Sequence, residues 1–151
     1  MIKFLVLTST YNRPKLLKKC INSVLKQTYS QWKMIIIDDN SKKEIKKEIE
    51  GYLKDRRIKF LKNKKNKGVN FTRNKGLDYL SKNYSNRWVV FLDDDDWLNE
   101  NCLKKAQEII QKQPSYKWFL SNKILNKKKV TNVKKKKKIN KVKKKKKNII
   151  I

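Results

Sequence analysis

Residues 88–97 read Trp-Val-Val-Phe-Leu-Asp-Asp-Asp-Asp-Trp, an apolar run that ends in four consecutive aspartates. A continuous apolar run of this length is typical of a strand that is buried on both faces, as strands of parallel sheets are. The aspartates then follow the carboxyl end of that strand. Because ligands of open parallel sheets bind outside the carboxyl ends of the strands, this stretch indicates both an α/β fold and the edge that carries its site.

Further apolar runs of strand length occur along the chain, separated by segments with helical spacing. The other expected strands are residues 3–7, 34–37, 58–61 and 118–121, and apolar residues recur at helical spacing within residues 14–25, 70–80 and 103–110. Strands that alternate with helices indicate βαβ units. We therefore predict an α/β, Rossmann-like fold: a mostly parallel sheet with helices on both faces.

Some polar and aromatic residues have a structural interpretation. Ser41-x-x-Glu44 is the pattern of a capping box, which predicts a helix from about Ile45 to Leu53. The segment Asp38–Ser41 is open to two interpretations, a turn that caps this helix or a ligand-binding loop. The tryptophans, Trp32, Trp88, Trp97 and Trp118, are expected to pack in the core rather than to bind a sugar.

Charge is distributed unevenly along the 151 residues, which carry 42 Lys and Arg against 13 Asp and Glu, a net charge of +29. The 29 residues after Asn122 contain 15 lysines and no acidic residue. Blocks of like charge do not fold by themselves. We predict one folded domain at residues 1–122 and a lysine-rich, disordered tail at residues 123–151. A truncated or frame-shifted reading frame would produce the same tail.

Composition excludes several classes of site. The chain has no histidine, which excludes imidazole catalysis, and its two cysteines, Cys20 and Cys102, form no C-x-x-C pattern, which leaves no disulfide framework or zinc site. The sequence contains no run of 18 apolar residues, so no membrane-spanning helix is predicted. Neither G-x-G-x-x-G nor G-x-x-x-x-G-K-[ST] occurs, so no glycine loop cradles a phosphate. The expected location is the cytoplasm.

Four adjacent carboxylates at Asp93–Asp96 repel one another unless positive charge offsets the repulsion. Surface lysines are one source of that charge. A divalent cation is the other, because Mg²⁺ and Mn²⁺ take oxygen ligands and Mg²⁺ is commonly held by carboxylates together with substrate phosphates. The cluster therefore predicts a site for a metal ion and a diphosphate.

Six motifs in order resemble the family 2 inverting glycosyltransferases, over roughly residues 2–120. They are Thr10-Tyr11-Asn12-Arg13-Pro14, Ser23-Val24-Leu25-Lys26-Gln27-Thr28-Tyr29, Ile35-Ile36-Ile37-Asp38-Asp39-Asn40-Ser41, Asn66-x-Gly68, Thr72-Arg73-Asn74-x-Gly76 and Phe91-Leu92-Asp93-Asp94-Asp95-Asp96-Trp97-Leu98. The resemblance implies that the chain is the nucleotide-sugar-binding half of an A-type glycosyltransferase. It also implies the role of that family in the assembly of surface polysaccharides or glycolipids.

The resemblance also implies the roles of individual residues. Thr10 and Tyr11, with Asn12 beside them, would line the nucleotide pocket, Asp39 would read the base with support from Asp38, and Arg73 would lie near the diphosphate. In the family's D-x-D motif, Asp93 or Asp94 would face the ribose and Asp95 would bind Mg²⁺ or Mn²⁺, together with Asp93. The four aspartates allow the registers 93/95 and 94/96, of which 93/95 is preferred because Asp93 directly follows the apolar strand.

The implied activity is metal-assisted transfer of a sugar from a nucleotide-diphospho-sugar, a UDP-sugar first, to an unknown glycan, lipid or protein acceptor. In the family a second half supplies the carboxylate that acts as general base. No acidic residue follows Glu108, so the base is expected to lie outside this chain. Two alternatives are an inactive nucleotide-binding fragment and a basic nucleic-acid-binding protein. The lysine tail is open to two interpretations: a contact with an anionic surface at the inner face of the membrane, or a biased composition without a binding role.

Overall fold

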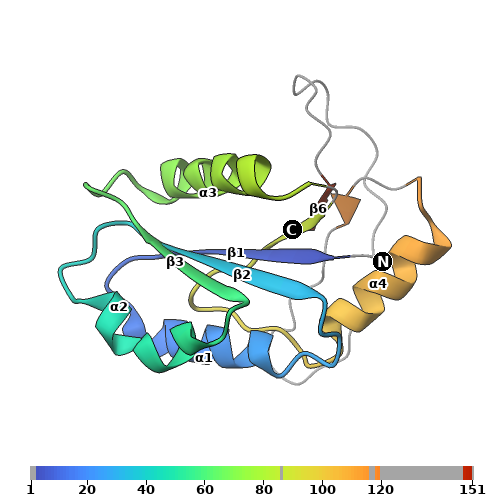
Figure 1. The fold of residues 1–151 in the computed structure, drawn as a ribbon, viewed down its shortest axis with the longest axis horizontal. Helices are drawn as coiled ribbons and strands as arrows, with labels where there is room; N and C mark the ends of the chain where they lie inside the picture. The colour runs from blue at the N-terminus through green and yellow to red at the C-terminus, as the bar shows by residue number, and fades with distance from the viewer. Residues whose placement is uncertain (1–2, 86, 116–117, 120–147, 151) are drawn as a thin grey trace.

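The computed structural model describes residues 3–85, 87–115, 118–119 and 148–150. Strands and helices alternate through most of the chain, as the sequence predicts (Figure 1). The elements are β1 (Phe4–Thr10), α1 (Pro14–Leu25), β2 (Trp32–Asp38), α2 (Ile45–Glu48), the 3-10 helix η1 (Glu50–Lys54), β3 (Ile58–Lys62), α3 (Val69–Asn83), β4 (Trp88–Phe91), α4 (Cys102–Lys112), β5 (Trp118–Phe119) and β6 (Asn148–Ile150).

The strands form one sheet in the order β3-β2-β1-β4-β6-β5, and every neighbouring pair is parallel. β1 lies between β2 and β4, with Thr10 opposite Asp38 on one side and Leu7 opposite Phe91 on the other. The polar residues that follow β1, β2 and β4 therefore meet at one edge. The predicted Rossmann-like α/β fold is confirmed.

Alternate residues of the central strands supply two separate cores. Phe4 and Val6 of β1 pack in the larger core with residues of α1, α2 and α4, whereas Leu5 and Leu7 pack with Leu80 of α3. Figure 1 shows the corresponding layers, with α3 on one face of the sheet and α1 and α2 on the other. Because consecutive side chains of a strand point to opposite faces, a continuous apolar run is what such a three-layer arrangement requires.

Gly76 allows α3 to approach β1 and β2 closely. A Cβ at this position would lie 2.5 Å from Leu7 Cδ1 and 3.0 Å from Ile37 Cδ1, whereas a Cβ at Gly51 would have no heavy atom within 4 Å. We expect Gly76→Val to lower the free energy of unfolding by about 1–3 kcal/mol, the usual cost of overpacking. Gly51→Val is the matched control. Urea denaturation that shows equal stability of the two variants would contradict this packing.

Two local expectations are wrong. The predicted helix over residues 45–53 is divided into α2, of four residues, and η1, and Gly51, a poor helix former, lies within η1. The N-cap position of α2 is Glu44 and carries no side-chain cap bond. The Ser41 hydroxyl instead accepts from the Asn12 N–H and donates to Asp38. Trp32 and Trp88 are buried as expected, but Trp97 is 70% exposed. It follows the aspartates in a loop outside the sheet, so its expected place in the core is wrong.

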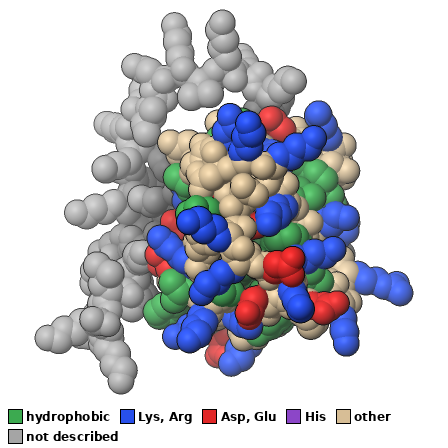
Figure 2. Space-filling view, turned by 90° about the vertical axis from the view of Figure 1, so that its left-hand side faces the viewer, with side chains coloured by type: hydrophobic (Ala, Val, Ile, Leu, Met, Phe, Trp, Pro, Cys, Tyr) green, Lys and Arg blue, Asp and Glu red, His purple; other side chains and the backbone are tan. Residues whose placement is uncertain are grey.

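The boundary predicted at Asn122 stays a prediction. Residues 120–147 lie outside the described residues, as does the side chain of Trp118, and within the expected tail the structure describes only β6, which pairs with β4. Among the described residues, no helix is long and apolar enough to cross a membrane. Lys and Arg side chains spread over the face seen in Figure 2, with a few acidic side chains among them.

Candidate functional site

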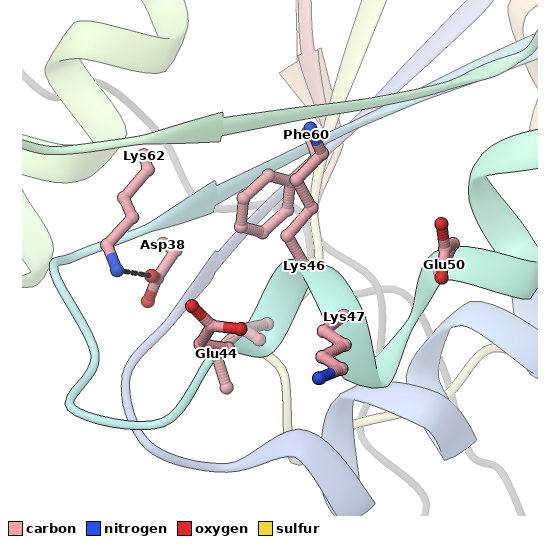
Figure 3. Close-up of a pocket in the computed structure, with 8 residues that line it drawn as sticks. Asp38, Glu44, Lys46, Lys47, Glu50, Phe60 and Lys62 are labelled. Carbon is pink, nitrogen blue, oxygen red and sulfur yellow. Dashed lines mark ion pairs between the residues drawn. The ribbon is translucent and has the colours of Figure 1, made fainter.

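A pocket of about 690 Å³ opens between α2 and β3 (Figure 3). It is lined by Asp38, Glu44, Ile45, Lys46, Lys47, Glu50, Phe60 and Lys62. Asp38 is the one predicted site residue in this lining, and its carboxylate lies 3.8 Å from the Lys62 ammonium group. The aspartates after β4 do not line this pocket, so the hollow and the carboxylate cluster are separate features of the described chain.

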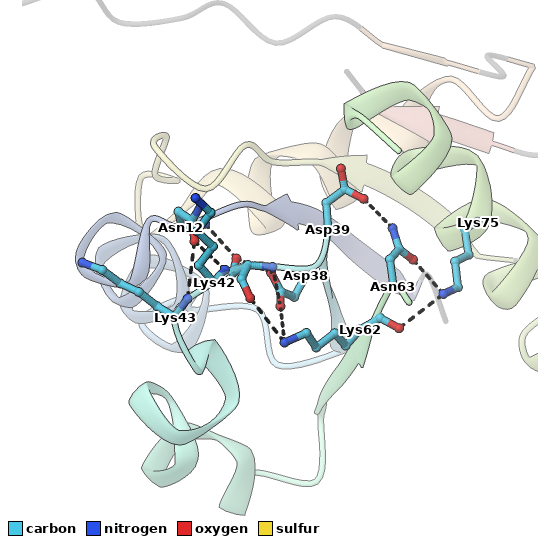
Figure 4. A network of polar contacts seen from close by, with 9 residues as sticks. Asn12, Asp38, Asp39, Lys42, Lys43, Lys62, Asn63 and Lys75 are labelled. Carbon is cyan, nitrogen blue, oxygen red and sulfur yellow. Dashed lines mark hydrogen bonds and ion pairs between the residues drawn. The ribbon is translucent and has the colours of Figure 1, made fainter. Parts of the chain in front are cut away.

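Asp38 and Asn12 join the loop after β1 to the loop after β2 (Figure 4). The buried Asp38 carboxylate accepts hydrogen bonds from the Ser41 hydroxyl and, at 3.1 Å, from the Ser41 backbone N–H. The backbone N–H of Asn12 donates to Ser41 Oγ at 2.7 Å, and Asn12 Oδ1 accepts from the Lys42 N–H at 2.9 Å. Asn12 and Asn40 adopt positive φ values of 57° and 63°, which asparagine tolerates better than most residues. The two loops are therefore held together by hydrogen bonds between residues of the chain itself.

The carboxylate of Asp39 fixes the segment between β3 and α3. It accepts hydrogen bonds from the side-chain amide of Asn63 at 2.7 Å, from the Lys67 N–H at 3.0 Å and from the Gly68 N–H at 2.7 Å. Burial favours a higher pKa for Asp39, but these donors outweigh it and hold the pKa below its ordinary value. Asp39 is only 4% exposed, so its contacts are internal. Its role in reading a base stays a prediction.

A tight turn separates the four aspartates into two groups. The Asp96 N–H donates to the Asp93 carbonyl at 3.1 Å, and one carboxylate oxygen from each of Asp93, Asp95 and Asp96 lies within 4.8 Å of the others. Asp94 points inward instead, and its carboxylate accepts a 2.7 Å bond from the Thr10 hydroxyl. Three convergent carboxylate oxygens suit a hard divalent cation. Asp93 and Asp95, the pair of the preferred register, both belong to this group, and Asp96 joins them.

Two arginines supply positive charge to the aspartates. Arg13, directly before α1, lies 3.3 Å from an Asp94 oxygen and 3.2 Å from an Asp95 oxygen, and Arg73 of α3 forms an ion pair with Asp93. Burial raises the pKa of Asp94, against the opposing effects of the Thr10 hydroxyl and the Arg13 charge. The repulsion expected among the aspartates is thus offset partly by arginine.

The structure places the predicted residues at the carboxyl edge of the sheet, but in distinct surroundings. Thr10 and Asp94 are buried against each other, whereas Tyr11 is 41% exposed beside them. Arg73 contacts Asp93. Sequence reasoning assigned no role to Arg13 or Asn63, and it treated Ser41 as a helix cap or as part of a ligand-binding loop rather than as a partner of Asp38. Their partners are 81, 24 and 3 residues away, and only the Ser41 contact is local enough to be read from spacing.

Comparison with known proteins places this geometry in a family. The family described as Glycosyl transferase family 2 matches residues 5–150. The chain is 34% identical, over 110 residues, to the GalNAc(5)-diNAcBac-PP-undecaprenol beta-1,3-glucosyltransferase of Campylobacter jejuni, a match that covers 72% of this chain and 34% of that protein. It is 33% identical to the Escherichia coli glucosyltransferase WfgD, with 62% of this chain and 35% of that protein covered. The chain thus spans about a third of the length of these relatives.

Solved structures agree with the sequence comparison. The structure of S. aureus TarS 1–349 in complex with UDP-GlcNAc matches with a TM-score of 0.72 and 27% identity, over 87% of this chain and 37% of that chain. The same protein in complex with UDP matches with a TM-score of 0.71 and 26% identity, over 87% of this chain and 38% of that chain. With its parallel sheet and the family match over residues 5–150, the chain belongs to glycosyl transferase family 2.

Proposed function

We propose that this chain binds a nucleotide-diphospho-sugar, a UDP-sugar in the first instance, together with Mg²⁺ or Mn²⁺, as the donor-binding part of a glycosyltransferase. The observation that carries the proposal is the convergence of three carboxylate oxygens within 4.8 Å at Asp93, Asp95 and Asp96. These residues follow β4, next to the loop after β1, at the edge where parallel sheets bind ligands. The structural neighbour TarS, solved with UDP-GlcNAc, supports the choice of donor.

In this proposal Asp95 and Asp93 hold the cation, with Asp96 as a third oxygen donor. A divalent cation at this position supplies a Lewis acid that offsets the negative charge of the leaving nucleoside diphosphate. Arg73, through its ion pair with Asp93, orients that carboxylate and adds positive charge beside the diphosphate. The Thr10 hydroxyl holds Asp94 below the turn, which fixes the path of the backbone that presents the other three side chains.

The nucleoside would lie over the loop after β1, where Tyr11 offers an exposed ring and Asn12 is locked to Ser41. Asp38 and Asp39 would form the opposite side of the nucleotide site. They would do so through the two loops whose backbone N–H groups, at Ser41 and Gly68, donate to their carboxylates. Transfer also requires a general base on the acceptor hydroxyl, and we assign that role to no residue of this chain.

The test is calorimetric titration of UDP in the presence of excess Mn²⁺. We expect Tyr11→Ala to weaken UDP binding about tenfold, because stacking of a base on an aromatic ring contributes about 1–3 kcal/mol. Tyr11→Phe retains the ring and serves as the matched control, with an affinity close to that of the parent. Since Tyr11 is 41% exposed, neither change should alter the unfolding midpoint. A parent chain that binds no UDP, or that binds ADP equally well, would refute the proposed donor.

A further inference from the structure

Arg13 occupies an unusual position between a buried and an exposed aspartate. One terminal nitrogen of its guanidinium, Nη1, lies 3.3 Å from Asp94 Oδ1 and 3.2 Å from Asp95 Oδ2. The Asp94 side chain is 7% exposed and the Asp95 side chain is 49% exposed. Arg13 directly precedes Pro14, the first residue of α1, whereas both aspartates follow β4.

The Asp95 carboxylate can therefore bind either of two positive groups, a metal ion or the Arg13 guanidinium. It is one of the three residues whose oxygens converge within 4.8 Å, and it is also an ion-pair partner of Arg13. A cation that binds at the convergent oxygens comes close to the guanidinium that already contacts Asp95. Two positive charges near one carboxylate repel each other, and each weakens the other's hold on it.

We propose that Arg13 is an internal competitor of the divalent cation: it neutralises Asp95 in the metal-free protein, and metal binding displaces it from Asp95 while it stays paired with Asp94. The inference rests on the metal site proposed above. Asp94 makes the displacement inexpensive, because the buried carboxylate keeps the guanidinium as a partner after Asp95 has left it. Arg13 then sets the affinity for the metal without being one of its ligands.

Arg73 is less suited to this role. Its side chain is 34% exposed, against 53% for Arg13, and its guanidinium lies 5.8 Å from the centre of the Phe91 ring. Among the carboxylates of the described residues, only Asp93 forms an ion pair with Arg73, so displacement would leave Arg73 without a second carboxylate. Among the basic residues that the structure describes, Arg13 alone bridges a residue of the convergent group and a buried aspartate outside it.

The experiment measures Mn²⁺ affinity without nucleotide, by electron paramagnetic resonance of the free ion. We expect Arg13→Gln to bind Mn²⁺ about tenfold more tightly than the parent, the effect of removing one unit charge ~5 Å from a divalent ion in water. Arg13→Lys keeps the charge and should bind like the parent. Lys18→Gln removes a charge from α1 that is paired with Glu48 instead, and should change the affinity less than twofold.

The outcomes separate this inference from the metal site itself. If the parent binds Mn²⁺ and Arg13→Gln binds it equally or more weakly, the competitor role is overturned and the metal site stands. If neither chain binds Mn²⁺, both are overturned. A second measurement needs no variant: Mg²⁺ added to the parent should shift the Nε–Hε resonance of Arg13 and leave that of Arg57, paired with Asp55, unchanged. An unshifted Arg13 resonance at saturating Mg²⁺ would also overturn the inference.

Discussion

Asp39→Ala is expected to lower the free energy of unfolding by about 1–3 kcal/mol, a large effect for one polar substitution. The change removes the acceptor of three donors, the Asn63 amide and the N–H groups of Lys67 and Gly68. Lys67 and Gly68 are exposed, so water can reach their N–H groups, and the buried Asn63 amide keeps the Thr72 hydroxyl as an acceptor at 2.9 Å. The expected loss is therefore that of about one unpaired donor, about 1–3 kcal/mol. Urea denaturation at neutral pH measures the loss, and Asp78→Ala, at an exposed position of α3, is the control with an expected change within about 0.5 kcal/mol.

The pH dependence of this loss has a definite sign. The folded-state pKa of Asp39 lies below its ordinary value, so the folded chain binds the Asp39 proton less readily than the unfolded chain does. Its stabilisation is therefore fully present above the unfolded pKa of about 3.9 and disappears as the pH falls through the folded pKa. The difference between parent and Asp39→Ala should shrink below about pH 4. A difference that stays constant down to pH 2 would contradict the carboxylate as its source.

Asp39→Ala also tests the predicted reading of the base. If the folded variant binds UDP as tightly as the parent, Asp39 serves only the segment between β3 and α3. We expect weaker binding, because that segment precedes α3, which carries Arg73. The stability measurement and the UDP titration are independent, so loss of the fold and loss of the ligand contact are not confused.

The second large effect concerns the coupling between metal and nucleotide. UDP and Mn²⁺ should each raise the affinity for the other by about 5–150-fold in the parent, the usual range of such coupling, because a diphosphate meets repulsion at bare carboxylates. Asp95→Asn preserves the shape of the side chain, removes one charge from the convergent group and should abolish the coupling. Calorimetric titration of UDP with Mn²⁺ and with excess chelator, on both chains, gives the four affinities required.

Glu100→Gln provides the control for this experiment, since it removes a carboxylate close in the sequence but outside the convergent group. It should leave the coupling unchanged. Equal UDP affinity of the parent with Mn²⁺ and with chelator would exclude a cation that bridges protein and diphosphate. Coupling that survives in Asp95→Asn but not in Asp93→Asn would instead move the principal metal ligand to Asp93.

The layers of the fold could be predicted because they depend on continuous apolar runs. Residues 34–37 and 88–92 were expected to be buried strands, and the structure has strands at Trp32–Asp38 and Trp88–Phe91. The helix expected at residues 45–53 was not formed as one piece. α2 begins only at Ile45, with Glu44 at its N-cap position, and the Ser41 hydroxyl bonds with Asn12 and Asp38 instead of capping a helix. A sequence pattern shows which hydrogen bonds a residue is able to make, but not which of them it makes in the folded chain.

The same limit applies to the site. Four consecutive aspartates indicated a charged cluster, but their division into three convergent carboxylates and one buried one depends on the turn and on Thr10, which is 84 residues away from Asp94. Arg13 likewise lies 81 residues from Asp94. Contacts of that separation are set by the order of strands in the sheet, and no local spacing rule reports them.

The central position of β1 determines when the site can form as the chain is made. β1 is synthesised before β4, one of its two neighbours in the sheet, which begins only at Trp88. Until the ribosome has released the segment through Asp96, the polar residues after β1 and β2 have no partners from the third loop. Such non-local pairing is slow, since the entropy of closing a long loop is lost before the contacts form. The nascent chain should therefore gain ligand affinity only after β4 has paired with β1, which leaves no earlier intermediate able to hold a donor.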